Sequence, residues 1–248
     1  MTDEHLIGRQ PALDSSSSRR WLVAVSGIAF VVFLIVAWFA NGAVTPHYNA
    51  PDHDWTTWAK NTEMKGRFAA FFALLAGLVF LPFAGAIRDM LARAEANDGG
   101  SPRLVQVAYA GGLIGVTSFA IATVTFSGAS AEGAQANPVV SRAIATGDVG
   151  PFLVAAMGFA GFLGAGGLVA LRSGILPRWL GAVALIGAVG FCIAFLTTLD
   201  GTADGSVFGY GFFPGIVALV IWSVWFSITS YRATRRVDHV PAALDARL

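Results

Sequence analysis

Six long apolar runs, separated by polar segments, constrain this chain more than any other feature. None of the six contains Asp, Glu, Lys, Arg or His. Each has close to the roughly 20 residues that a helix needs to cross a hydrocarbon core of about 30 Å. The runs are Trp21–Ala40, Phe68–Ile87, Leu104–Phe126, Phe152–Leu171, Trp179–Leu199 and Phe212–Ser230. We therefore predict an all-α fold, a polytopic bundle of six transmembrane helices.

The composition excludes a compact water-soluble domain. Hydrophobic residues make up 55% of the 248 residues and charged residues only 12%. Soluble domains carry roughly 25% charged residues. A soluble fold with half that charge would expose large apolar patches and aggregate.

The distribution of Lys and Arg predicts the orientation of the spans. Of the 16 Lys and Arg residues, all but Lys60, Lys65, Arg67 and Arg142 lie in the two tails and in the two loops on the same side. Cytoplasmic segments carry such an excess, so both termini are expected in the cytoplasm. We divide the chain into a disordered cytoplasmic tail at residues 1–19, a transmembrane domain at 20–231 and a cytoplasmic tail at 232–248.

A helix is expected to precede the second span on the outer side. Asp54 can cap this helix, which carries Trp55 and Trp58 on one face. The helix is expected to run on through Lys60 and Arg67 into the span itself. Tryptophan is a common anchor at the membrane interface.

A second outer helix is expected between the third and fourth spans. Asn137 is a good N-cap, Pro138 suits the first helical position, and Gly147 is a stop. The apolar face would consist of Val139, Val140, Ala143 and Ile144. We expect this short helix to lie on the membrane surface.

Small residues recur at every fourth position in the third, fourth and fifth spans. Helices in lipid associate through close backbone approach at such residues, so we expect these spans to form a tightly packed centre. The alternative is that the small residues line a substrate path. The residues are Gly111 and Gly115; Ala156, Ala160 and Gly164; Ala184 and Ala188; and Gly190 with Ala194.

The loop into the fifth span reads Ser173-Gly174-Ile175-Leu176-Pro177-Arg178-Trp179-Leu180-Gly181. Gly174 is placed to end one helix and Pro177 to start the next, with Arg178 among the lipid head groups. This turn and the six-span layout resemble an uncharacterised family of small bacterial integral membrane proteins, described only as a domain of unknown function. The resemblance implies the fold and supplies no catalytic residues. We accordingly expect the chain in the bacterial inner membrane.

Titratable side chains concentrate in the segment after the first span. His47, Asp52, His53 and Asp54 offer the nitrogen and oxygen ligands that Zn²⁺ or another divalent ion takes. Their spacing matches no established metal motif. The alternative is a solvated acidic loop in which carboxylates such as Asp54 cap helices.

Hydroxyl side chains gather near the outer end of the third span. Thr123, Thr125 and Ser127 are candidates for a polar pocket there. Their hydroxyls can equally bond to the carbonyl one helical turn back, which satisfies them without a ligand.

The inventory of the spans favours binding over catalysis. Apolar surface, small residues and hydroxyls suffice for a ligand pocket, whereas an acid–base pair is missing. We therefore expect a non-enzymatic integral membrane protein that binds a lipid or an apolar small molecule, or that steadies a membrane partner. One alternative is an outer-face metal-binding protein or metal-dependent enzyme. Another is an uncoupled transporter of an apolar solute.

The expected partners follow from the same features. Membrane lipids come first, with a partner membrane protein or a homo-oligomer as further options. No cofactor is expected apart from the divalent metal of the alternative hypothesis. Nucleic acid is not expected, because Arg232, Arg235 and Arg236 match a membrane flank attracted to anionic lipid.

Overall fold

The computed structural model describes residues 15–41, 45–47, 49–97, 103–147, 149–196 and 211–237. In these ranges the chain forms helices and no strand, and six of the helices are long and apolar enough to cross a membrane. The all-α prediction with six spans is thus confirmed. The expectations for residues 1–14, 197–199 and 238–248 fall outside the described residues.

The six long helices coincide with the six predicted runs and extend past most of them. α1 already begins within the predicted N-terminal tail, and α9 continues beyond the predicted end of the transmembrane domain. Their bounds are α1 Ser15–Asn41, α2 Asp52–Asn97, α3 Arg103–Ala129, α6 Val149–Ser173, α7 Arg178–Phe195 and α9 Phe212–Val237. Two short helices, α4 Glu132–Gln135 and α5 Pro138–Gly147, lie between α3 and α6.

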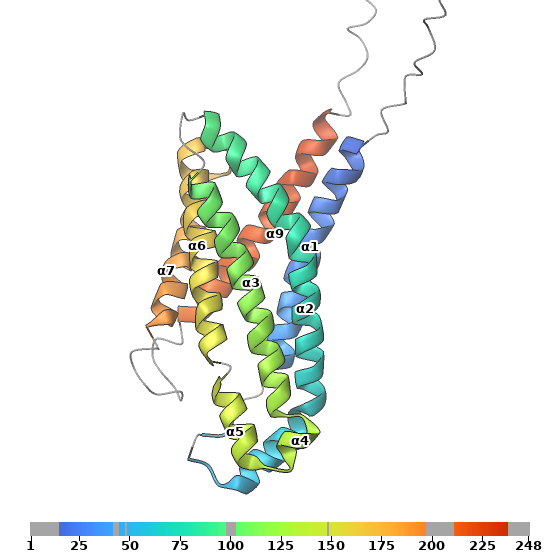
Figure 1. Ribbon diagram of the computed structural model, residues 1–248. Helices are drawn as coiled ribbons and strands as arrows, with labels where there is room; N and C mark the ends of the chain where they lie inside the picture. The colour runs from blue at the N-terminus through green and yellow to red at the C-terminus, as the bar shows by residue number, and fades with distance from the viewer. Residues whose placement is uncertain are drawn as a thin grey trace, which may run out of the picture.

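α2 is a single helix of 46 residues, about 69 Å long at 1.5 Å per residue. This confirms the predicted continuation from Trp55 and Trp58 into the second span. The helix begins at Asp52, two residues before the predicted cap, and the Asp54 N–H donates to the Pro51 carbonyl at 3.0 Å. Pro82 lies inside it and removes one backbone hydrogen bond. Such a proline accounts for the change of direction along α2 in Figure 1.

The six spans form a ring in which each helix packs on its neighbours in sequence. The pairs are α1–α2, α2–α3, α3–α6, α6–α7, α7–α9 and, closing the ring, α9–α1. The closing contact between α1 and α9 is the smallest of the six. The start of α1 and the end of α9 lie at one end of the bundle, here called the terminal end, and α4 and α5 lie at the other, here called the cap end (Figure 1).

The closest helix packing joins α3 and α6. A side chain at Gly158 of α6 would collide with the backbone of Gly115 on α3, so only glycine allows this approach. Ala160 is also buried. The predicted packing of the third and fourth spans through small residues is therefore confirmed. α6 in turn packs on α7, where Gly167 faces Ala184.

Aromatic rings fill the centre of the bundle. The ring centroid of Phe80 on α2 lies 4.8 Å from that of Phe30 on α1 and 5.8 Å from that of Phe162 on α6. Phe162 lies 5.1 Å from Trp222 of α9. All four side chains are buried, so the described helices meet at a layer of packed rings.

The cap end has a small core of its own, made by the first turns of α2, the end of α3, and α5. Ser141 of α5 donates to the Ala129 carbonyl of α3 at 2.7 Å. The buried members of this core are Trp55, Trp58, Ala59, Phe126, Ala129 and Ala145. The predicted helix α5 starts at Pro138 with Asn137 as its cap, since Asn137 Oδ1 accepts from the Val139 N–H at 3.1 Å.

The predicted apolar face of α5 is mostly turned outward. Val139, Val140 and Ala143 are exposed and Ile144 is half-buried, whereas Ser141 and Ala145 are buried. Because the buried residues Ser141 and Ala145 are small, α5 lies close to α3. The expectation that α5 lies on the membrane surface stays a prediction.

Candidate functional site

An apolar groove lies where the ring of helices closes, between α1 and α9. It has a volume of about 270 Å³, slightly below the range of roughly 300–1,000 Å³ for pockets that take drug-sized ligands. Four lining residues come from α1 and five from α9. They are Leu34, Ile35, Trp38 and Phe39 on α1, and Phe213, Ile216, Val217, Val220 and Ile221 on α9.

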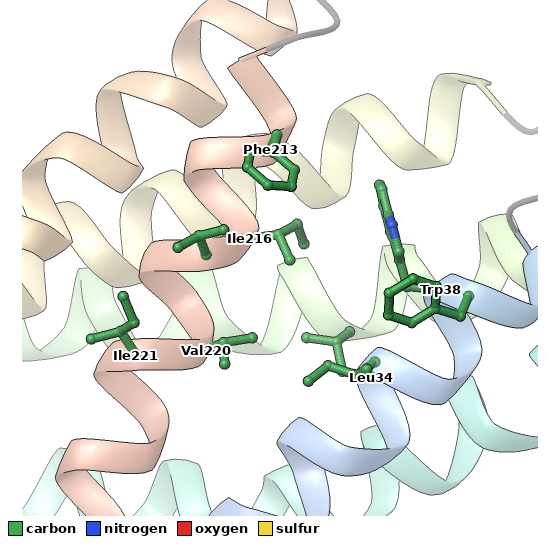
Figure 2. Close-up of a pocket in the computed structure, with 9 residues that line it drawn as sticks. Leu34, Trp38, Phe213, Ile216, Val220 and Ile221 are labelled. Carbon is green, nitrogen blue, oxygen red and sulfur yellow. The ribbon is translucent and has the colours of Figure 1, made fainter.

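The groove opens because α1 and α9 are close at one end and apart at the other. Toward the terminal end, a side chain at Gly27 of α1 would collide with the Ser227 hydroxyl of α9 and with the Phe83 ring of α2, so α1 packs tightly on both helices there. Toward the cap end, bulky side chains such as Trp38 and Phe213 stand between the helices (Figure 2). α1 and α9 diverge toward the cap end (Figure 1), and the groove lies between them there.

Burial varies with depth in the groove. Leu34 at its floor is only 1% exposed, whereas Phe39 and Phe213 at its mouth are 79% and 73% exposed. All nine residues lie in the membrane-spanning parts of α1 and α9. The groove thus opens sideways, toward the lipid that surrounds a membrane bundle.

Trp38 is held in place by neighbouring rings. Its ring centroid lies 5.8 Å from that of Phe212 in a stacked arrangement, and 6.2 Å from that of Phe152 in an edge-to-face arrangement. These contacts tie α1 to α9 and to α6, and they fix the indole beside the groove. Trp38 carries the single polar side-chain atom among the nine lining residues, the indole nitrogen drawn in blue in Figure 2.

The cap is held to α2 by polar contacts. Arg142 of α5 donates through Nη2 to the Ala50 carbonyl at 3.1 Å and to Asp52 Oδ1 at 3.0 Å. Its guanidinium carbon lies 5.7 Å from the centre of the Trp55 ring, within the range of a cation–π contact. Through its contacts with Ala50, Asp52 and Trp55, Arg142 holds α5 against the start of α2, which is a structural role.

A second polar contact fastens α4. Gln135 Nε2 donates to Glu63 Oε2 at 2.8 Å and to the Ser130 carbonyl at 2.9 Å. Glu63 also forms an ion pair with Arg67 one turn further along α2. The short helix α4, which was not predicted from the sequence, is thus tied to α2 by an amide side chain.

The residues of the metal hypothesis lie near the start of α2. Asp52 pairs with Arg142, and His53 Nε2 lies 2.9 Å from Asp54 Oδ1. His47 precedes the helix, and its carbonyl accepts from the Ala50 N–H. Across the described ranges, no three or more His, Cys, Asp or Glu side chains are placed to hold one ion. This geometry lends the metal hypothesis no support, and it stays a prediction.

The three hydroxyl residues of α3 do not share one environment. Thr123 is fully buried and donates to the Phe119 carbonyl at 2.6 Å, one turn back. Thr125 and Ser127 are half-buried. Residues two apart on a helix point about 200° away from each other, so Thr125 faces away from the side that Thr123 and Ser127 share. The polar pocket stays a prediction.

None of the nine groove residues was predicted from the sequence as part of a site. Within a wholly apolar span, a residue that faces a groove has the same character as one that faces lipid. The pairing of α1 with α9 is a tertiary contact between the first and last spans, and no sequence signal marks it.

Comparisons with known proteins return no match for this chain, whether with protein-family models, with curated proteins or with solved structures.

Proposed function

We propose that this protein is a non-enzymatic integral membrane protein that holds an apolar chain, from a lipid or an apolar small molecule, in the groove between α1 and α9. The observation that carries the proposal is the lining of the groove. Eight of the nine residues have purely hydrocarbon side chains, and the ninth is Trp38. Such a lining supports binding of an apolar ligand and supplies no general acid or base.

A flexible chain fits this groove better than a partner helix does. Helices in lipid pack through small residues that let their backbones approach closely. The groove has no Gly, Ala or Ser in its lining. Beside the groove, the Gly and Ala of α9 face α7 instead, where Gly215 meets Phe191 and Ala218 meets Gly187. These contacts favour lipid binding over the steadying of a membrane partner.

The position of the groove favours binding over transport. It lies at the edge of the bundle, where α1 meets α9, and not along the bundle axis. The centre is occupied by the rings of Phe30, Phe80, Phe162 and Trp222. A ligand in the groove would therefore stay beside the lipid from which it came.

Filling the groove is expected to lower ligand retention. Val220→Trp places an indole in the space beside Leu34, so an apolar chain loses its room. We expect the amount of lipid that co-purifies in mild detergent, measured by mass spectrometry, to fall several-fold. The matched control is Val189→Trp on α7, where the native side chain is 59% exposed and lies outside the groove. Equal lipid retention in both variants would contradict the proposal.

We also propose that both termini lie in the cytoplasm and that the membrane is the bacterial inner membrane. The location rests on the resemblance of the turn at residues 173–181. The orientation is supported by the excess of Arg in the tails and in the two loops on their side.

Reporter fusions test this orientation. A reporter that is active only outside the cytoplasm is expected to be silent after Arg88 or Arg172, and active after Arg142. The reason is that Arg88 and Arg172 end spans at the terminal end of the bundle, whereas Arg142 lies in the cap. Activity after Arg88 and Arg172 together with silence after Arg142 would reverse the orientation.

A further inference from the structure

We propose that the occupant of the groove is an ester-linked acyl chain of a glycerolipid, taken from the leaflet at the cap end, whose ester carbonyl accepts a hydrogen bond from Trp38 Nε1. This inference rests on the proposed function and names its ligand class. It follows from the place of Trp38 in the groove, the state of its N–H, and the length of the groove.

The Trp38 N–H is available to a ligand. Within the described part of the chain, Trp38 makes ring contacts with Phe152 and Phe212 and no hydrogen bond. Its nitrogen also differs from the indole nitrogens of Trp55, Trp58, Trp222 and Trp225, which are fully buried without an acceptor in the described part of the chain. An indole N–H in contact with lipid usually finds an acceptor.

Trp38 stands at the level where ester groups lie in a bilayer. It is three residues from the last residue of α1, Asn41, and it contacts Phe212, the first residue of α9. Tryptophan is enriched at this interface because one part of its ring is apolar and its N–H is polar. The lipid at this depth offers ester carbonyls, which accept hydrogen bonds and have no donor of their own.

The length of the groove matches one leaflet. From Phe213 to Ile221 the lining extends over eight residue steps of α9, about 12 Å along the helix. Half of a hydrocarbon core is roughly 15 Å. A chain whose ester lies at Trp38 would therefore run past Ile216 and Val220 and end near Ile221, close to the middle of the membrane.

The chemistry of the lining sets the selectivity. An acyl ester and an alkyl ether place the same hydrocarbon chain in the groove, but the ether lacks the carbonyl oxygen. The ether keeps only its bridging oxygen, which is a weaker acceptor for the Trp38 N–H than a carbonyl oxygen. A neutral hydrogen bond contributes enough to favour the ester by roughly two- to tenfold in binding ratio.

Competition between two lipids tests the inference. The purified full-length protein is offered equal amounts of diacyl phosphatidylcholine and of the dialkyl ether phosphatidylcholine with the same chain length. Bound lipid is then counted by native mass spectrometry. The wild-type protein is expected to prefer the ester by about two- to tenfold. Trp38→Phe keeps an aromatic ring against Phe152 and Phe212 but removes the N–H, so this variant is expected to bind both lipids equally.

The control is Trp21→Phe, since Trp21 lies at the other end of the membrane-spanning part of α1 and is 58% exposed. This variant is expected to keep the ester preference, because Trp21 does not line the groove. If tryptophan acted only as a general interfacial residue, both variants would change the preference. A wild-type protein without ester preference, or a Trp38→Phe variant that keeps it, would overturn the inference. If Trp38→Phe does not fold, the wild-type ratio alone decides.

Failure of the inference and failure of the proposed function give different results. If both lipids bind equally to the wild-type protein and both are lost in Val220→Trp, the groove binds a hydrocarbon chain, but Trp38 does not select the ester through a hydrogen bond. If Val220→Trp retains both lipids as well as the wild-type protein does, the groove is not the site and both proposals fail.

Discussion

Trp222→Ala is expected to destabilise the folded protein by about 3–5 kcal/mol, the usual cost of removing a large buried aromatic side chain. Trp222 is fully buried, with its ring centroid 5.1 Å from that of Phe162 and 5.5 Å from that of Phe226. A side chain at Gly166 would lie 3.4 Å from the Trp222 ring, so the space around it is already filled. Because lipid is as apolar as the core, the loss comes mainly from dispersion contacts that the cavity removes.

The measurement for Trp222 is a free energy of unfolding from titration with a denaturing detergent. Trp21→Ala is the matched control, since Trp21 is 58% exposed and its loss leaves no cavity. The control is expected to unfold within about 1 kcal/mol of the wild-type protein. If the two variants were equally stable, the packed ring layer would not be a major source of stability.

Gly158→Ala is expected to destabilise the protein by about 1–3 kcal/mol through overpacking. The added methyl group would meet the backbone of Gly115, which cannot move aside as a flexible side chain can. α3 and α6 would have to separate along the most extensive helix contact in the bundle.

Gly85→Ala is the control for Gly158. A side chain at Gly85 of α2 meets nothing within 4 Å, so only the difference in helix propensity acts there. This variant is expected to be as stable as the wild-type protein or slightly more stable, since Ala is favoured over Gly by up to about 1 kcal/mol. If Gly158→Ala and Gly85→Ala had the same free energy of unfolding, α3 and α6 would not approach each other as closely as described.

The spans were predictable because each depends on a local property. A run without charges, about 20 residues long, has to be a buried or membrane-spanning helix wherever its neighbours lie. The start of α5 was equally local, since Asn137 followed by Pro138 suits a helix start in any context. The close approach of α3 and α6 was predictable because Gly111 and Gly115 are four residues apart, the spacing at which small residues let helices in lipid approach closely.

The groove was not predictable, because it depends on contacts between distant parts of the chain. Trp38 and Phe213 are brought together only when the ring of helices closes. The sequence shows Trp38 as one more aromatic residue near the end of a span. The position of Gly27 against Ser227 also follows from the crossing of two helices and not from any local pattern.

Side-chain chemistry alone was a weaker guide than helix geometry. Asp52 was a candidate metal ligand, yet its carboxylate lies 3.0 Å from Arg142, about 90 residues away in sequence. Thr123 was a candidate for a polar pocket, and its hydroxyl bonds to its own helix. The partner of Asp52 is a side chain that folding brings from a distant part of the chain. The partner of Thr123 is a carbonyl of its own helix, the alternative that the sequence had left open.

The most direct test of lipid binding in the groove is an experimental density map of the wild-type protein in lipid nanodiscs. We expect a continuous, tube-like density between α1 and α9 that begins beside Trp38 and ends near Ile221. This density should be stronger than that of the lipid over the exposed face of α7 around Val189. A map in which α1 and α9 close on each other, or in which the groove holds no more density than the face of α7, would contradict the account.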